Sequence, residues 1–225
     1  MKFTDDYPLK PFQADDPGRL HKVISEYPLA TVISQGPEFP AVSQLPLVLD
    51  PDRNVLQGHL DRNNPHANVL MHGGNVYALF NGPNHYMSPA IYPDSQYPGW
   101  NYVSVHVEGV VETIEDSGWL TELLLRTAEQ NEPADSGYRL KPTQRGFDSL
   151  VRYIVGFEIK IMDIRGIFKL AQDKGAGHAR LARDHLSTVV ARDASGFIDA
   201  MLAVSNSDGP ATSESNGNTP GDSDA

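Results

Sequence analysis

Short stretches in which hydrophobic and polar residues alternate dominate the chain, and this pattern is typical of β-strands. Turn residues such as those at 35–37 and 50–52 separate the stretches. The first five follow one another without the intervening helices that parallel crossovers require. The sequence therefore predicts a mostly β (α+β) fold in which about seven strands form a barrel with peripheral helices. The predicted strands cover residues 29–34, 42–49, 54–60, 76–80, 102–114, 153–164 and 166–170.

Apolar residues at helical spacing predict the peripheral helices. The first helix begins after Asp16 as N-cap, has Pro17 at its first position and ends at Pro28. Further helices are predicted over residues 116–130, 176–192 and 196–204.

The domain organisation follows from the absence of a repeat or a long Pro/Gly-rich linker before residue 205. We expect one domain over residues 1–204. Residues 205–225 are polar and acidic and cannot bury enough apolar surface to offset the entropy of ordering, so a disordered acidic tail is predicted there.

Composition narrows the classes of function. The 225 residues carry a formal net charge of -11 and include no cysteine. Disulfides, thiolate metal sites, iron–sulfur clusters and a cysteine nucleophile are therefore excluded. Basic residues are scattered and the predicted helices lack a basic recognition face, which disfavours direct nucleic-acid binding. Without a long apolar run or the apolar core of a signal peptide, a soluble cytoplasmic protein with no membrane span is expected.

The first stretch with candidate chemistry is 55–65, V-L-Q-G-H-L-D-R-N-N-P. Strand alternation places His59 on the polar side, beside Gly58, which lets another group approach closely. A neutral imidazole in this position can ligate a haem iron. The alternative is a surface histidine on a half-solvated strand. Arg62 and Asn64 form either a polar turn or contacts to an anionic cofactor group.

The second stretch, residues 80–102, is rich in Pro, Tyr and Trp and is predicted to be irregular. Such loops are often pocket walls. Tyr86 and Trp100, with Asn101 beside the latter, can stack on and anchor a planar cofactor, or the aromatic rings plug one end of the barrel as core. Ser88 either faces the pocket or caps a turn.

Five further positions complete the set of residues considered. His106 lies on the polar face of an alternating strand, as a ligand or proton carrier or simply in a cross-strand hydrogen bond. Tyr77, in a shorter strand, is interpreted as core. Lys169, Gln172 and Lys174 follow where the barrel should close, and each is either a contact for a phosphate, propionate or carboxylate, or a solvated side chain. Metal-ligand spacings, nucleophile elbows, Walker loops and G-x-G-x-x-G are absent.

Several motifs together resemble the PaiB-type family of FMN-binding negative transcriptional regulators. They are G-H-L-D-R-N-N-P at 58–65, F-N-G-P-N-H-Y-M-S-P at 80–89, P-G-W-N-Y-V-S-V-H-V-E-G at 98–109, I-V-G-F-E-I at 154–159 and F-K-L-A-Q-D at 168–173. The resemblance covers nearly the whole predicted domain. It implies a split β-barrel, normally a homodimer with a cofactor pocket at the subunit interface.

The family has two functional branches. One resembles regulators of protease synthesis and sporulation. The other comprises haem-dependent piperazate synthases, which close an N–N bond within N5-hydroxy-ornithine with loss of water. In that branch the histidine of the Gly-His motif is the axial haem ligand, which implies His59 as the iron ligand here, with Lys169 or Lys174 as the base.

Departures from the regulator pattern favour the enzyme branch. They are Asp61 and Asn63 in the Gly-His motif, Gly99 before Trp-Asn-Tyr, and the acidic tail. We therefore expect a haem b enzyme acting on a small-molecule amino-acid substrate, with an FMN-binding regulator as the alternative. The expected cofactor contacts are His59, Arg62, Asn64, Tyr86, Ser88, Trp100, Asn101, His106 and Gln172.

Overall fold

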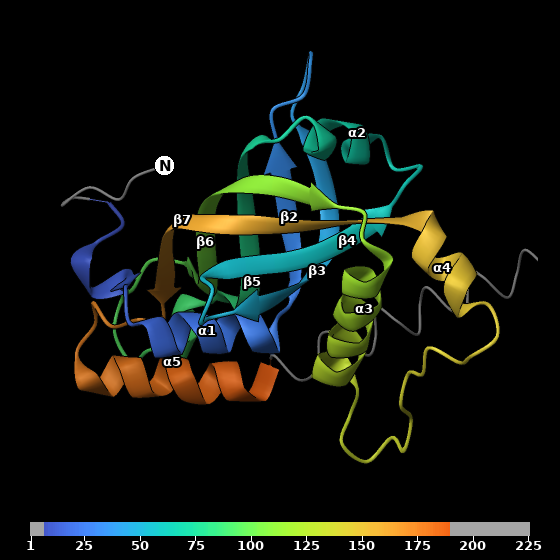
Figure 1. Cartoon of the computed structure of the whole chain (residues 1–225). Helices are drawn as coiled ribbons and strands as arrows, with labels where there is room; N and C mark the ends of the chain where they lie inside the picture. Colours follow the sequence, from blue (N-terminus) through green and yellow to red (C-terminus); the bar gives the residue numbers. More distant parts are fainter. Residues whose placement is uncertain (1–6, 190–225) are drawn as a thin grey trace, which may run out of the picture.

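A closed barrel of six antiparallel strands forms the centre of the computed structural model, which describes residues 7–189 (Figure 1). The strands follow the order β7-β4-β3-β2-β5-β6, and pairing of β6 with β7 closes the barrel. A short additional strand, β1 (Gln13–Ala14), pairs with β7. The barrel strands are β2 (Leu29–Ser34), β3 (Ala41–Asp50), β4 (Val55–Asp61), β5 (Gly74–Met87), β6 (Gly99–Ile114) and β7 (Ile154–Lys169).

Alternation along the strands separates the core from the outer wall. Val32, Leu47, Leu56, Phe80 and Phe157 are fully buried inside the barrel. The side chains between such inward positions point outward, because successive strand residues face opposite sides of a sheet. The outer wall is therefore where polar side chains can gather.

Helices cover both ends and one side of the barrel (Figure 1). Helices α1 and α2 contribute residues to the main core, whereas α3 and α4 share a second apolar cluster and α5 packs against the end of β5. Among residues 7–189, no helix is long and apolar enough to cross a membrane. The helices are α1 (Pro17–Glu26), α2 (Pro65–Met71), α3 (Ser117–Asn131), α4 (Phe147–Tyr153) and α5 (Ala176–Val189), with 3-10 turns η1 (Lys10–Phe12) and η2 (Pro89–Ile91).

The predicted fold class is confirmed, with differences in individual elements. The two strands predicted around Gly166 are one strand, because Gly166 stays paired with Val105. The segment predicted as irregular is mostly a long β5–β6 hairpin, whose register shift between Asn81 and Asn84 accommodates Gly82 and Pro83. Only residues 88–98 lie outside these strands.

Local capping explains one of the helices that strand alternation did not predict. The Asn64 side chain accepts a hydrogen bond from His66 N at 3.0 Å, and Pro65 occupies the first turn of α2. The same arrangement at Asp16 and Pro17 starts α1, as predicted. Helix α4 and strand β1 were also not predicted. The helix predicted over 196–204 and the tail over 205–225 lie outside the described residues.

Candidate functional site

A hydrogen-bonded chain of three side chains lies on the outer wall of the barrel. His106, on β6, is bonded through Nδ1 to the Tyr77 hydroxyl on β5 at 2.5 Å and through Nε2 to the Ser104 hydroxyl at 2.8 Å. Strand alternation puts Ser104 and His106 on one face of β6, and the β5–β6 register brings Tyr77 beside them. Both ring nitrogens of the half-buried His106 thus face hydroxyl groups.

Burial keeps the titratable members of this chain uncharged. Burial, and then the nearby Arg165 charge, lower the pKa of the His106 imidazole. Burial raises the pKa of the Tyr77 phenol. At neutral pH the arrangement is therefore a neutral imidazole between two hydroxyls, which can pass a proton along the chain in either direction.

An arginine with two carboxylate partners lies next to this chain. Arg165, on β7, is paired with His106 in the strand register. Its guanidinium bonds the Glu108 carboxylate and contacts Asp163 at 2.6 Å. Only 12% of the Arg165 side chain is exposed. These three charged residues therefore lie beside the uncharged Tyr77–His106–Ser104 group.

The three hydrogen-bonded side chains line a pocket of about 300 Å³, which we call the phenol pocket. Its walls combine three tyrosines with apolar and neutral polar side chains, a composition suited to a planar ligand with hydrogen-bonding edges. Lys169 does not line the pocket, but it is half-buried and is paired in the β6–β7 register with Tyr102, which does. The lining residues are Tyr7, Tyr77, Leu79, Asn81, Tyr102, Ser104, His106 and Ile167.

His59 lies on the outer wall at a different place, opposite Gly156 of β7. Its ring is half-buried, and burial lowers the pKa of the imidazole. Nδ1 is buried without a hydrogen-bond partner among the described residues. Trp119 and Leu120 of α3 approach Gly156 so closely that a Cβ there would lie 2.4 and 2.7 Å from them. Helix α3 therefore packs next to the His59 position.

The two polar residues that follow His59 have structural partners. Arg62 contacts the Glu115 carboxylate at 2.6 Å and donates to the Ile154 carbonyl at 3.1 Å. Asn64 caps α2 and donates to the Ser43 hydroxyl at 3.2 Å. Both residues thus have partners within the chain, and their contact to an anionic cofactor group stays a prediction.

The predicted aromatic wall is at the outer end of the β5–β6 hairpin. Tyr86 and Trp100 are 45% and 49% exposed with ring centroids 6.0 Å apart, so the alternative that they plug the barrel is wrong. Asn101 is buried, and its Nδ2 has no hydrogen-bond partner among the described residues. Ser88 caps η2 by accepting from Ala90 N at 3.2 Å.

The two predicted residues after β7 belong to the connection with α5. Gln172 accepts from Leu170 N at 2.6 Å and donates to the Phe168 carbonyl. Lys174 donates to Gln96 Oε1 at 2.8 Å. Both side chains hold the segment between β7 and α5 in place.

The structure therefore does not bring all the predicted site residues together at one place on the barrel. His59, on β4, is paired with Gly156 near the start of β7, whereas Lys169 is the last residue of β7. The two side chains therefore lie near opposite ends of this strand. Thirteen strand positions separate Gly156 from Lys169, about 40 Å of strand path at roughly 3.3 Å per residue. His106 and Lys169 share the region of the phenol pocket, and His59 has a separate environment.

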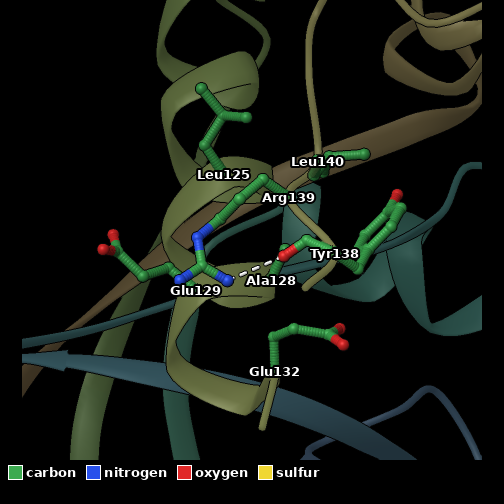
Figure 2. Close-up of a pocket in the computed structure, with 7 residues that line it drawn as sticks. All are labelled: Leu125, Ala128, Glu129, Glu132, Tyr138, Arg139 and Leu140. Atoms are coloured by element: carbon green, nitrogen blue, oxygen red, sulfur yellow. Dashed lines mark hydrogen bonds between the residues drawn. The ribbon is translucent and has the colours of Figure 1, made fainter. Parts of the chain in front are cut away.

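Another hollow, of about 180 Å³, lies between α3 and residues 138–140 (Figure 2). Figure 2 shows the Arg139 guanidinium among the lining residues, where it donates to the Tyr138 carbonyl at 2.7 Å. Its lining mixes apolar and charged side chains, and it includes no residue of the motifs. Within residues 7–189, no group of three or more His, Asp or Glu side chains is arranged to hold a metal ion.

Sequence reasoning missed two members of the site. Tyr77 was interpreted as core, which is wrong, because its ring lies on the outer wall and its hydroxyl bonds His106. Arg165 was not singled out, although alternation along β7 places it on the same face as Lys169. The missing information was the strand register, which decides which outward residues become neighbours.

The fold and this site define a class of protein, a split β-barrel with a cofactor-sized pocket on its outer wall. The chain belongs to the family described as "Putative FMN-binding domain", whose model matches residues 7–163. A relative is "Protease synthase and sporulation protein PAI 2" of Bacillus subtilis (strain 168), 27% identical over 173 residues that cover 75% of this chain and 83% of that protein. The PaiB-type resemblance is thereby confirmed.

Solved structures share the fold at low sequence identity. The FAD and haem binding protein from Mycobacterium smegmatis is 16% identical with a TM-score of 0.59, covering 76% of this chain and 80% of that chain. The flavocytochrome Anf3 from Azotobacter vinelandii is 16% identical with a TM-score of 0.56, covering 70% and 69%. These structures confirm the split-barrel architecture.

Proposed function

We propose that the chain binds FMN in the phenol pocket. The observation that carries this proposal is the neutral Tyr77–His106–Ser104 chain opening into a cavity of about 300 Å³ with aromatic walls. A flavin ring is planar and carries hydrogen-bond donors and acceptors along its edges, which matches such a lining. Family membership supports the same cofactor. Bound there, FMN would supply electron-transfer chemistry that side chains lack.

Lys169 is the proposed phosphate contact. It is half-buried beside Tyr102 and forms no ion pair with another described residue. An ammonium group in that position can form a charge-assisted hydrogen bond to a phosphate oxygen. A hydrogen bond to a charged group contributes about 1.5–3 kcal/mol, so its loss should weaken FMN binding roughly 10- to 100-fold.

Comparison of FMN with riboflavin tests this assignment, because riboflavin lacks only the phosphate. Lys169→Gln should weaken FMN binding and leave riboflavin binding unchanged, measured by quenching of flavin fluorescence. Lys160→Gln, at an exposed position on the same strand, is the matched control and should bind both like the wild type. Wild-type chain that binds neither flavin would refute the proposed function, whereas equal loss of both ligands in Lys169→Gln would refute the phosphate contact.

We also propose that two copies of the chain associate through the β2–β3 hairpin. Phe39 and Val42, near the turn of this hairpin, are 78% and 57% exposed. Such exposed apolar side chains are typical of interaction surfaces, and the family resemblance implies a second copy as occupant. Light scattering should give twice 24.7 kDa for the wild type and a smaller mass for Val42→Asp. A monomeric wild type at all accessible concentrations would refute the dimer.

Regulation of transcription by direct DNA binding is disfavoured, because the basic residues are scattered along the chain. The expected result of a gel-shift titration at low salt is no sequence-specific complex. A complex that discriminates between operator and random sequence would reverse this expectation.

A second candidate function, a haem-dependent enzyme of the piperazate synthase type, depends on His59. Its neutral, half-buried imidazole has the donor chemistry of an axial ligand, and the unpartnered Nδ1 is the buried nitrogen, which leaves ligation to Nε2. Arg62 is the nearest cation along the strand for a propionate, after release of Glu115. Haem iron would supply Lewis-acid assistance to N–O cleavage in N5-hydroxy-ornithine.

The position of the proposed base, Lys169 or Lys174, restricts how this enzyme could be assembled. Lys169 is the last residue of β7 and Lys174 follows it, at the end of the strand remote from His59, so they can reach a substrate held at His59 only from a second copy of the chain. The test is the absorption spectrum of chain reconstituted with haem. His59→Ala should lose the Soret band of histidine-ligated iron and the turnover of N5-hydroxy-ornithine, whereas His72→Ala should keep both. An unchanged Soret band in His59→Ala would refute the ligand assignment.

A further inference from the structure

A second pocket of about 540 Å³ adjoins the phenol pocket on the outer wall, and we call it the amide pocket. It lies between the end of β2, the start of β5 and the middle of β6. Tyr77 is the one residue that lines both pockets. Tyr77 therefore borders both the proposed cofactor site and a second cavity of ligand size.

The lining of the amide pocket defines the kind of ligand it suits. Ile33, Val110 and Met162 give it apolar walls, and Gln35 and Asn75 supply amide groups that donate and accept hydrogen bonds. None of the described residues in its lining is Lys or Arg. Its one carboxylate, that of Glu108, is paired with Arg165. An uncharged amphipathic molecule fits this lining better than a phosphate or carboxylate.

The hydrogen bonds of Tyr77 show what its hydroxyl can offer such a ligand. A neutral imidazole has one N–H and one acceptor nitrogen. When Nδ1 of His106 carries the hydrogen, it donates to the Tyr77 oxygen and Nε2 accepts from Ser104. The Tyr77 O–H is then free to donate to a ligand.

We propose that the amide pocket is the substrate subsite beside the FMN site, that it takes small uncharged carbonyl compounds, and that Tyr77 donates a hydrogen bond to the carbonyl oxygen. This inference rests on the proposed FMN binding for its cofactor. The binding of the carbonyl compound does not depend on FMN, because Tyr77 and the other lining residues belong to the chain itself.

The test uses the full chain, with and without FMN, and 2-cyclohexen-1-one as the probe. Its carbonyl stretching band should move to lower frequency on binding, because a hydrogen bond from Tyr77 weakens the C=O bond. Tyr77→Phe should abolish that shift and weaken binding roughly 2- to 10-fold, the equivalent of one neutral hydrogen bond. Tyr102→Phe is the matched control, because Tyr102 lines only the phenol pocket, and the shift should persist.

A blocking variant locates the probe. Val110 is 41% exposed in the wall of the amide pocket, so Val110→Trp fills the cavity without entering the core. It should raise the dissociation constant of the probe at least tenfold and leave that of FMN unchanged. The inference would be overturned if Tyr77→Phe and Val110→Trp left probe binding or the band shift unaffected. It would also be overturned if the folded wild type did not bind the probe. Failure of FMN to bind, with the probe results as expected, would instead refute the proposed cofactor alone.

Discussion

Acid destabilisation through His66 is the prediction that the structure specifies most closely. The ring is 2% exposed, and its Nδ1 and Nε2 lie 3.0 Å from the Ser43 and Ser34 hydroxyls. Burial lowers the pKa of this imidazole below its usual 6.5. Below that pH the unfolded chain binds a proton that the folded chain resists. Stability is therefore fully present above about pH 6.5 and is lost as the pH falls toward the folded-state pKa.

The magnitude follows from the linkage between protons and stability. One proton taken up on unfolding changes the free energy of unfolding by about 1.4 kcal/mol per pH unit. His59 and His106 are shifted in the same direction, so the wild type should show a slope of up to about three protons. His66→Gln should remove at most one of them and retain part of the hydrogen bonding.

The measurement is urea unfolding followed by tryptophan fluorescence between about pH 5 and pH 8. Ser43→Ala is the control, because it removes one hydrogen bond of His66 but not the titrating ring. Its free energy of unfolding should be lower by about 1 kcal/mol at every pH, with the slope retained. A His66→Gln protein with the wild-type slope would refute the reasoning.

Three further predictions concern packing and capping. Gly156→Ala should lower stability by about 1–3 kcal/mol, since its Cβ would lie 2.4 Å from the Trp119 ring; thermal melting within experimental error of wild type would contradict this. Asp116→Ala should cost about 0.5–2 kcal/mol because Asp116 accepts a hydrogen bond from Trp119 N at 2.7 Å, whereas Asp116→Asn should retain most of the stability in the same melts. Phe80→Ala should cost about 3–5 kcal/mol in urea unfolding, and a loss below about 1 kcal/mol would show that the core collapses around the site.

The parts of the fold that were predicted are those set by local sequence. Alternation identified the six barrel strands, although it divided β7 at Gly166. Asp16 with Pro17 marked the start of α1. The same type of cap at Asn64 and Pro65 was available for α2, but its seven residues are too few for a clear apolar stripe.

The parts that were not predicted depend on which strands pair and in what register. The alternation of β6 identified His106 as outward-facing, but only the pairing of β5 with β6 brings Tyr77 to it, and only the pairing of β6 with β7 brings Arg165. The aromatic segment was predicted as irregular because Gly82 and Pro83 interrupt its pattern. The long hairpin instead contains them at a register shift.

The separation of the two cofactor candidates along β7 makes their tests independent. Lys169 pairs with Tyr102 near one end of the strand, and His59 pairs with Gly156 near the other. Variants at non-contacting sites usually have additive effects, so Lys169→Gln should leave the haem spectrum unchanged and His59→Ala should leave FMN affinity unchanged. Cross-effects between them within one chain would require a change of fold, which far-ultraviolet circular dichroism would show. Cross-effects in a folded protein would place both residues in one composite site, and only a second copy of the chain can bring them together.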